Sequence, residues 1–142
     1  MKFLNFDRVI CLSPHPDDVE YSMSGTIKRC NETIFDIFCL SHGGITDKSS
    51  SPDRIDEIKL FWKMMHTENI NLIFPEYPYL DSFKLTYLID YIENKRIDKR
   101  VYDAVFTTPH DDTNSEHRLV NDITMAIVRN SPLSVFEYRT SS

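Results

Sequence analysis

Residues 8–20 read RVICLSPHPDDVE, an apolar run followed by a histidine between two prolines and then by two acids. The run Arg8–Ser13 is rich in large apolar side chains, which is typical of a short, buried strand of a parallel sheet. The residues that follow, from Pro14 to Asp18, are polar and braced by prolines, which is typical of a loop. A buried strand that leads into a loop of titratable side chains is the arrangement expected at the ligand-binding edge of an α/β sheet.

The rest of the chain alternates between apolar runs and segments of helical period. Further strands are predicted at residues 34–41, 71–74, 102–107 and 133–138. Helices are predicted at residues 22–30, 52–67, 84–94 and 116–130. This alternation implies βαβ units, and therefore a three-layer, Rossmann-like α/β domain with a mainly parallel sheet. The simplest winding gives the strand order 3-2-1-4-5, in which the loops after strands 1 and 4 diverge and open a crevice for a ligand.

Composition limits the class of protein. The 142 residues suit a single domain, residues 1–142, and the 41% hydrophobic and 27% charged fractions are those of an ordinary globular protein. The net charge of -6 argues against nucleic acid or an anionic membrane as the main partner. The N-terminus lacks the features of a signal peptide, no segment is apolar enough to span a bilayer, and the three cysteines suit a reducing compartment. We therefore expect a cytoplasmic protein that acts on a small molecule; the sequence leaves an oligomer open.

Two polar loops carry the residues that predict a site. In the first loop His15 and Asp18 are three residues apart, so both can face one centre, whereas Asp17 would point elsewhere. The second loop follows the fourth predicted strand and reads PHDDTNSEH over residues 109–117. Imidazole and carboxylate groups are natural ligands of a divalent cation, and we predict that His117 completes the site. The simpler interpretation is that Asp17 or Asp18 only caps the helix after the first loop. In the second loop, Asn114 or Ser115 would cap the next helix and His117 would be a surface residue.

The two loops resemble those of the LmbE-like, or PIG-L, family of zinc-dependent de-N-acetylases, which includes N-acetylglucosaminyl-phosphatidylinositol deacetylases. The resemblance covers nearly the whole chain in order and spacing, and its first motif is specific. The matching stretches are Ser13–Glu20 with Gly25–Ile27, Ser41–Gly44, Arg54 with Glu57, and Asp112–Arg118. The resemblance implies a hydrolase that removes an acetyl group from an N-acetylated amino sugar or its conjugate.

The resemblance also implies a role for each matching residue. The ligands of one zinc ion per chain would be His15, Asp18 and His117. The general base would be Asp17, which would take a proton from water and return one to the leaving amine. The substrate would meet Arg54 and the backbone of Gly43 and Gly44.

This chain departs from the family pattern at three places. The first is the glycine pair before Thr26, which reads Ser24-Gly25 here. The family usually carries an HxDH motif whose first histidine helps to stabilise the oxyanion, and Asn114 stands at that place here. We expect the oxyanion to rest on the metal and on the side-chain amide of Asn114, with His110 as an alternative partner. The chain ends at Ser142, where family members continue with further strands and loops, so we expect a C-terminally truncated or minimal domain.

Three other interpretations stay open. Two histidines and one carboxylate also describe iron(II) oxygenase sites, so ligand type alone leaves the identity of the metal open. A second interpretation is a metal- or sugar-binding domain of the same fold that has lost turnover. The third is a flavodoxin-like phosphate-binding domain without a metal, although no Gly-rich loop follows the first predicted strand.

Overall fold

A computed structural model describes residues 1–43, 52–77, 80 and 84–140 of the chain. Its centre is a 5-stranded sheet in the order β3-β2-β1-β4-β5. The strands are β1 (Arg8–Ser13), β2 (Ile34–Cys39), β3 (Ile70–Ile73), β4 (Ala104–Thr107) and β5 (Ser134–Glu137). Every neighbouring pair runs parallel. The predicted strand order and the mainly parallel sheet are confirmed.

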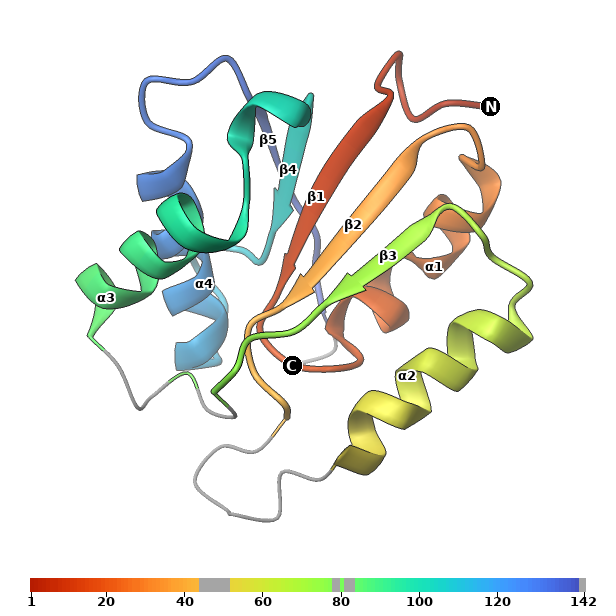
Figure 1. Cartoon of the computed structure of the whole chain (residues 1–142), viewed down its shortest axis with the longest axis horizontal. Helices are drawn as coiled ribbons and strands as arrows, with labels where there is room; N and C mark the ends of the chain where they lie inside the picture. The colour runs from red at the N-terminus through yellow and green to blue at the C-terminus, as the bar shows by residue number, and fades with distance from the viewer. Residues whose placement is uncertain (44–51, 78–79, 81–83, 141–142) are drawn as a thin grey trace.

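Helices cover both faces of this sheet, which gives the predicted three layers (Figure 1). They are α1 (Asp18–Arg29), α2 (Pro52–Met64), α3 (Leu85–Asp90) and α4 (Ser115–Ile127). A π-helical segment, η2 (Tyr91–Arg96), continues α3, and a short 3-10 turn, η3 (Lys99–Val101), leads toward β4. The first two helices pack on one face of the sheet, and α3 and α4 pack on the other. None of the helices in the described ranges has the length and apolar character that a membrane crossing requires.

Predicted boundaries differ from the observed ones by up to four residues, and three of these differences coincide with a helix cap, a 3-10 turn and a π-helix. Helix α1 begins at Asp18 and not at Ser22, because the Glu20 carboxylate accepts a hydrogen bond from the Asp17 amide at 3.0 Å and caps the first turn. The fourth strand begins at Ala104, later than predicted, since a 3-10 turn precedes it. The predicted helix 84–94 is α-helical only to Asp90 and continues as a π-helix.

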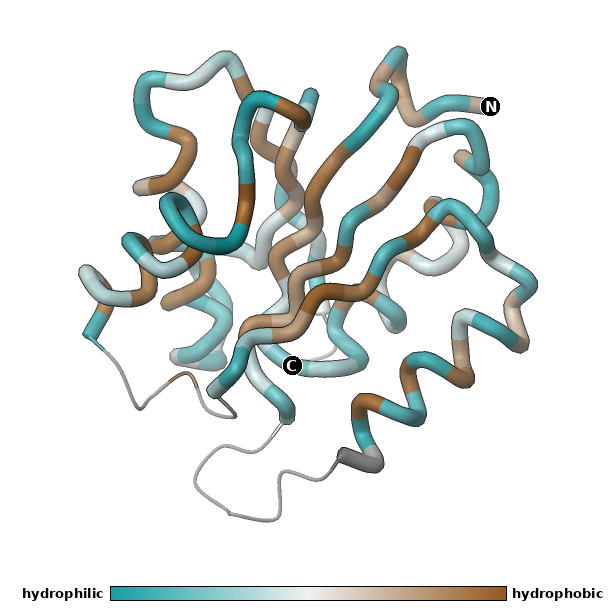
Figure 2. The backbone as a smooth tube through the Cα atoms, viewed as in Figure 1, coloured by the Kyte–Doolittle hydropathy of each residue, from teal (hydrophilic) through white to brown (hydrophobic). Residues whose placement is uncertain are grey.

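Side chains alternate along the central strands between two apolar layers. On β1, Val9 and Cys11 belong to the layer under α1 and α2, whereas Ile10 and Leu12 belong to the layer under α3 and α4. Figure 2 shows hydrophobic residues running along the middle of the sheet, and an alternation of hydrophobic and hydrophilic residues along the helices. Both faces of each central strand are buried, which explains why these strands are almost continuously apolar in sequence.

One buried charge joins the strands away from the predicted site. Asp36 on β2 is 2% exposed, and its carboxylate accepts hydrogen bonds from Arg8 Nη2 at 2.8 Å and from Asn71 Nδ2 at 2.8 Å. The hydroxyl group of Tyr102 also donates to this carboxylate, at 2.6 Å. A buried carboxylate that loses its partners costs several kcal/mol, so these donors are part of the framework of the fold. They tie β1, β2, β3 and the segment before β4 to one anion.

We expect Tyr102→Phe to lower the free energy of unfolding by about 1–3 kcal/mol, because it removes a hydrogen bond to a buried charge. Urea denaturation measures this loss. The matched control is Tyr21→Phe, since Tyr21 is 71% exposed and its change should stay within about 0.5 kcal/mol. Equal stabilities of the two variants would contradict the structural role of the Tyr102 hydroxyl.

Candidate metal centre

Two loops meet at the carboxyl ends of β1 and β4, which are neighbours in the sheet (Figure 1). The loop after β1 carries His15, and Asp18 is the first residue of α1. The loop after β4 leads into α4, whose first turn carries His117. The parallel pairing of β1 with β4 therefore brings together the two segments that the sequence singled out.

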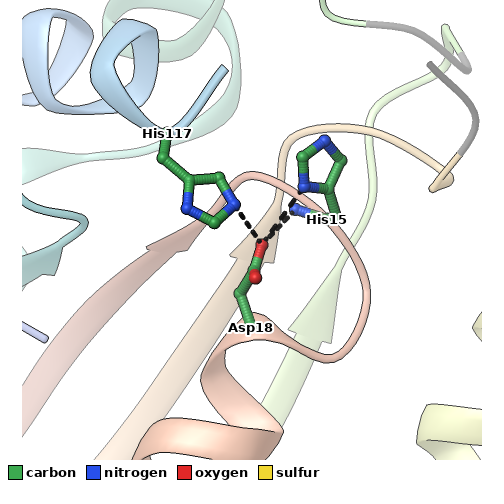
Figure 3. A group of neighbouring side chains, drawn as sticks. All are labelled: His15, Asp18 and His117. Carbon is green, nitrogen blue, oxygen red and sulfur yellow. Dashed lines mark hydrogen bonds and ion pairs between the residues drawn. The ribbon is translucent and has the colours of Figure 1, made fainter. Parts of the chain in front are cut away.

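The Asp18 carboxylate lies between the two imidazole rings (Figure 3). Its Oδ2 atom is 3.3 Å from His15 Nδ1 and 3.4 Å from His117 Nε2. The ring centroids of the two histidines are 5.4 Å apart. One ligand atom from each of the three residues lies within 4.8 Å of the others, and all three residues are buried. This donor set, two imidazoles and a carboxylate converging on one point, fits a small divalent cation.

A second carboxylate contacts the outer ring nitrogen of each histidine. His15 Nε2 is 3.2 Å from Glu116 Oε1, and His117 Nδ1 is 3.1 Å from Asp112 Oδ2. Such contacts select the tautomer and orient the ring, and they are usual behind metal-ligating histidines. Sequence reasoning did not assign a role to either acid. Their position beside His117 in a loop dense with acids was the signal that could have found them.

The protonation of this cluster depends on its carboxylates. Burial alone would lower the pKa of His15, but hydrogen bonds with Asp18 and Glu116 outweigh it and raise that pKa to about 9. For Asp18, burial acts in the opposite direction, but contacts with His117 and His15 lower the pKa to about 2. The pKa of His117 is also raised, by Asp18 and Asp112 against the effect of burial. Without a cation, protons on the imidazoles balance the buried carboxylates, and a divalent cation can take the place of those protons.

Among the residues that the structure describes, the cluster of candidate metal ligands does not include Asp17. Its carboxylate is largely exposed and lies 3.1 Å from Arg54 Nη2. Partial burial, and after it the charge of Asp18, raise the pKa of Asp17, while Arg54 and His15 act against this shift. The backbone of Asp17 has a φ of 101°, a conformation that costs a residue other than glycine about 1–3 kcal/mol. Such strain is found where function requires a particular side-chain direction.

Arg54 connects the loop after β1 with the segment that follows β2. Its guanidinium group donates to the carbonyl oxygen of Gly43 at 2.6 Å and to that of Pro16 at 2.9 Å. Gly43 has a φ of +99°, and a Cβ atom there would lie 2.7 Å from Arg54 Nη1. Position 43 therefore requires glycine both for its backbone and for its side-chain space. Gly44 lies outside the described residues.

The two residues predicted to contact the oxyanion, Asn114 and His110, lie in different surroundings. Asn114 is the N-cap of α4, and its Oδ1 atom accepts hydrogen bonds from the amides of Glu116 at 2.8 Å and His117 at 3.4 Å. This cap fixes the first turn that carries His117, and it occupies the carbonyl oxygen of the Asn114 side chain. His110 is exposed, and its ring contacts Glu137 at 3.3 Å. In the described part of the chain, the cluster of candidate metal ligands does not include His110.

Solved structures share this fold. N,N'-diacetylchitobiose deacetylase from Pyrococcus horikoshii has a TM-score of 0.57 and 24% identity over 89% of this chain and 51% of that protein. A deacetylase of the teicoplanin biosynthesis pathway has a TM-score of 0.73 and 12% identity over 94% of this chain and 67% of its own. The 4-carboxy-2-hydroxymuconate hydratase from Pseudomonas putida KT2440 has a TM-score of 0.59 and 20% identity over 89% of this chain and 55% of its own. The chain thus spans about half to two thirds of the length of these proteins, and identities this low establish the fold alone.

Sequence comparison identifies the family. No curated protein matched this chain. Residues 10–128 match the family model described as PIG-L, GlcNAc-PI de-N-acetylase. That range covers most of the chain and contains both loops of the site, from His15 to His117. The chain belongs to the PIG-L family.

Proposed function

We propose that this chain is a zinc-dependent amide hydrolase that removes an acetyl group from an N-acetylated amino sugar or its conjugate. The observation that carries the proposal is the Asp18 carboxylate shared between His15 and His117, with Asp17 as the adjacent residue. Membership of the PIG-L family supports the same reaction. The structural similarity to an N,N'-diacetylchitobiose deacetylase supports an amino sugar as the substrate. We also propose a cytoplasmic location, since all the cysteines are free and buried.

The residues that would hold the metal are His15, Asp18 and His117. Two imidazoles and one carboxylate suit zinc, and three protein ligands leave a further position open, as catalytic sites require. A bound divalent cation would supply a Lewis acid that activates water and polarises the amide carbonyl. The contacts of Glu116 and Asp112 with the outer ring nitrogens would keep both histidines in the tautomer that binds a cation.

The protein groups around the metal would carry the proton and orient the substrate. Asp17 would accept the proton of the attacking water and then return one to the leaving amine, a role for which its raised pKa is suited. Arg54 would hold the Asp17 carboxylate and contact the substrate, and the backbone of Gly43 and Gly44 would line the pocket. The Asn114 amide nitrogen would donate to the oxyanion, with His110 as the alternative partner.

A second candidate is a metal- or sugar-binding domain of the same family that does not turn over. The engagement of the Asn114 carbonyl in capping α4, at the place of the family's oxyanion histidine, favours this alternative. The fold by itself does not select the reaction, since a hydratase shares it. Acetate release from a panel of N-acetylated amino sugars separates the candidates, because a binding domain would release none. The family match gives no support to a flavodoxin-like phosphate-binding domain.

We expect His117→Ala to weaken zinc binding by more than about 100-fold, since even outer-shell changes cost about 10–100-fold. Competition with a chromophoric chelator and elemental analysis of the purified protein measure this loss. The control is His66→Ala, because His66 is exposed and lies outside the cluster of candidate ligands. A His117→Ala protein that keeps one zinc per chain with unchanged affinity would refute the assignment of the site.

We expect Asp17→Asn to lower the rate of acetate release by about 10²–10⁴-fold while zinc stays bound, because an amide cannot accept the proton. Steady-state release of acetate is measured together with zinc content. Asp56→Asn, an exposed change on α2, serves as the control and should leave the rate unchanged. Full activity of the Asp17→Asn protein would exclude this residue as the base.

The raised pKa of His15 predicts how stability depends on pH in the metal-free protein. Its contribution is fully present below the unfolded pKa of about 6.5 and is lost as the pH rises through the folded value of about 9. Zinc affinity should rise over the same range, since the ligands must release their protons. Thermal unfolding between pH 5 and pH 9.5, with and without zinc, is the measurement. The His15→Gln protein should show a flatter profile, and equal profiles of the two metal-free proteins would contradict the prediction.

A further inference from the structure

Glu20 joins the loop of the site to α2 through a buried hydrogen-bond chain. The indole Nε1 of Trp62 donates to Glu20 Oε2 at 2.7 Å, and the amide of Asp17 donates to Glu20 Oε1 at 3.0 Å. Glu20 is 6% exposed and Trp62 is 2% exposed. A buried carboxylate depends on hydrogen bonds that hold it in place. The position of the Glu20 carboxylate, and with it the acceptor for the Asp17 amide, therefore depends on Trp62.

The backbone of Asp17 needs such an acceptor. N-cap residues ordinarily adopt extended backbone angles, whereas Asp17 has a φ of 101°. In that conformation its amide is directed to Glu20, and the direction of its side chain follows from the same backbone angles. Without the Glu20 carboxylate in place, this hydrogen bond would be lost. The strained conformation of Asp17 would then lose the stabilisation that the bond supplies.

Helix α2 also contacts Asp17 by a direct route. Arg54, near the start of this helix, donates to the Asp17 carboxylate and to the carbonyl oxygen of Pro16. Trp62, near its end, acts on the amide of the same residue through Glu20. Helices α1 and α2 pack on the same face of the sheet (Figure 1), so the placement of α2 determines both contacts.

We propose that Trp62 is a positioning residue for Asp17 and acts through the Glu20 carboxylate. The inference rests on the proposed function, in which Asp17 is the general base. Trp62 contributes the N–H group that orients Glu20, and its ring fills the apolar layer under α2. The amino-acid sequence does not reveal this role, because the pattern of apolar positions carries no information on where an indole N–H points.

The kinetic test compares Trp62→Phe with Phe35→Leu, a change on β2 in the same apolar layer that leaves Trp62 and Glu20 intact. We expect Trp62→Phe to lower kcat about tenfold with KM and zinc content unchanged, since a displacement of about 1 Å can cost 10²-fold in rate. Phe35→Leu should lower Tm without that loss of kcat. An unchanged kcat in the zinc-loaded Trp62→Phe protein would overturn the proposal.

A second variant tests the route through Asp17. In the Asp17→Asn protein, adding Trp62→Phe should not lower the residual kcat further, because residues that act through one group are not additive. A further tenfold loss would show that Trp62 acts by a different route and would overturn the proposal.

Amide hydrogen exchange distinguishes failure of this inference from failure of the proposed function. We expect Trp62→Phe to accelerate exchange of the Asp17 amide several-fold relative to the amide of Ile27, which lies within α1. This result does not depend on whether any sugar is deacetylated. An unchanged ratio of the two exchange rates would overturn the positioning role. If the ratio changes as expected while the wild-type protein releases no acetate, the positioning role is upheld and only the proposed reaction fails.

Discussion

One carboxylate oxygen, Oδ2 of Asp18, contacts an imidazole from each of two loops that are far apart in the sequence. The contact exists because β1 and β4 are neighbours and parallel, so that the loops at their carboxyl ends meet. Three titratable side chains are buried there, and they tolerate burial only because each imidazole contacts carboxylates and the Asp18 carboxylate contacts both imidazoles. The rest of the site is arranged around this contact.

The side chains that begin the helices also build the site. Asn114 caps α4 and thereby fixes the turn that carries His117, while Glu20 and Asp17 cap α1 and fix the turn that carries Asp18. The acids behind the histidines, Glu116 and Asp112, lie in or next to the same first turn of α4. Residues that cap or begin the two helices therefore also place and orient the candidate ligands.

The framework is divided between the two faces of the sheet. The layer under α1 and α2 holds the contacts that reach the site, since Arg54 and Trp62 both come from α2. The layer under α3 and α4 holds the Asp36 anion with its donors, Arg8, Asn71 and Tyr102, which joins the strands and takes no part in the site. Loss of the Arg54 or Trp62 contacts in the first layer should therefore affect the position of Asp17, whereas loss of the donors to Asp36 in the second should affect the stability of the sheet.

The amino-acid sequence by itself determined the strand order and the meeting of His15, Asp18 and His117. Apolar periodicity separates strands from helices, and right-handed winding of βαβ units leaves few arrangements of them. Only the tertiary structure decided the start of α1, the left-handed backbone of Asp17 and the two carboxylates behind the histidines. The same holds for the bond between Trp62 and Glu20. These features depend on side-chain directions, which are set when α2 and α4 pack on the sheet and not by any local preference of the chain.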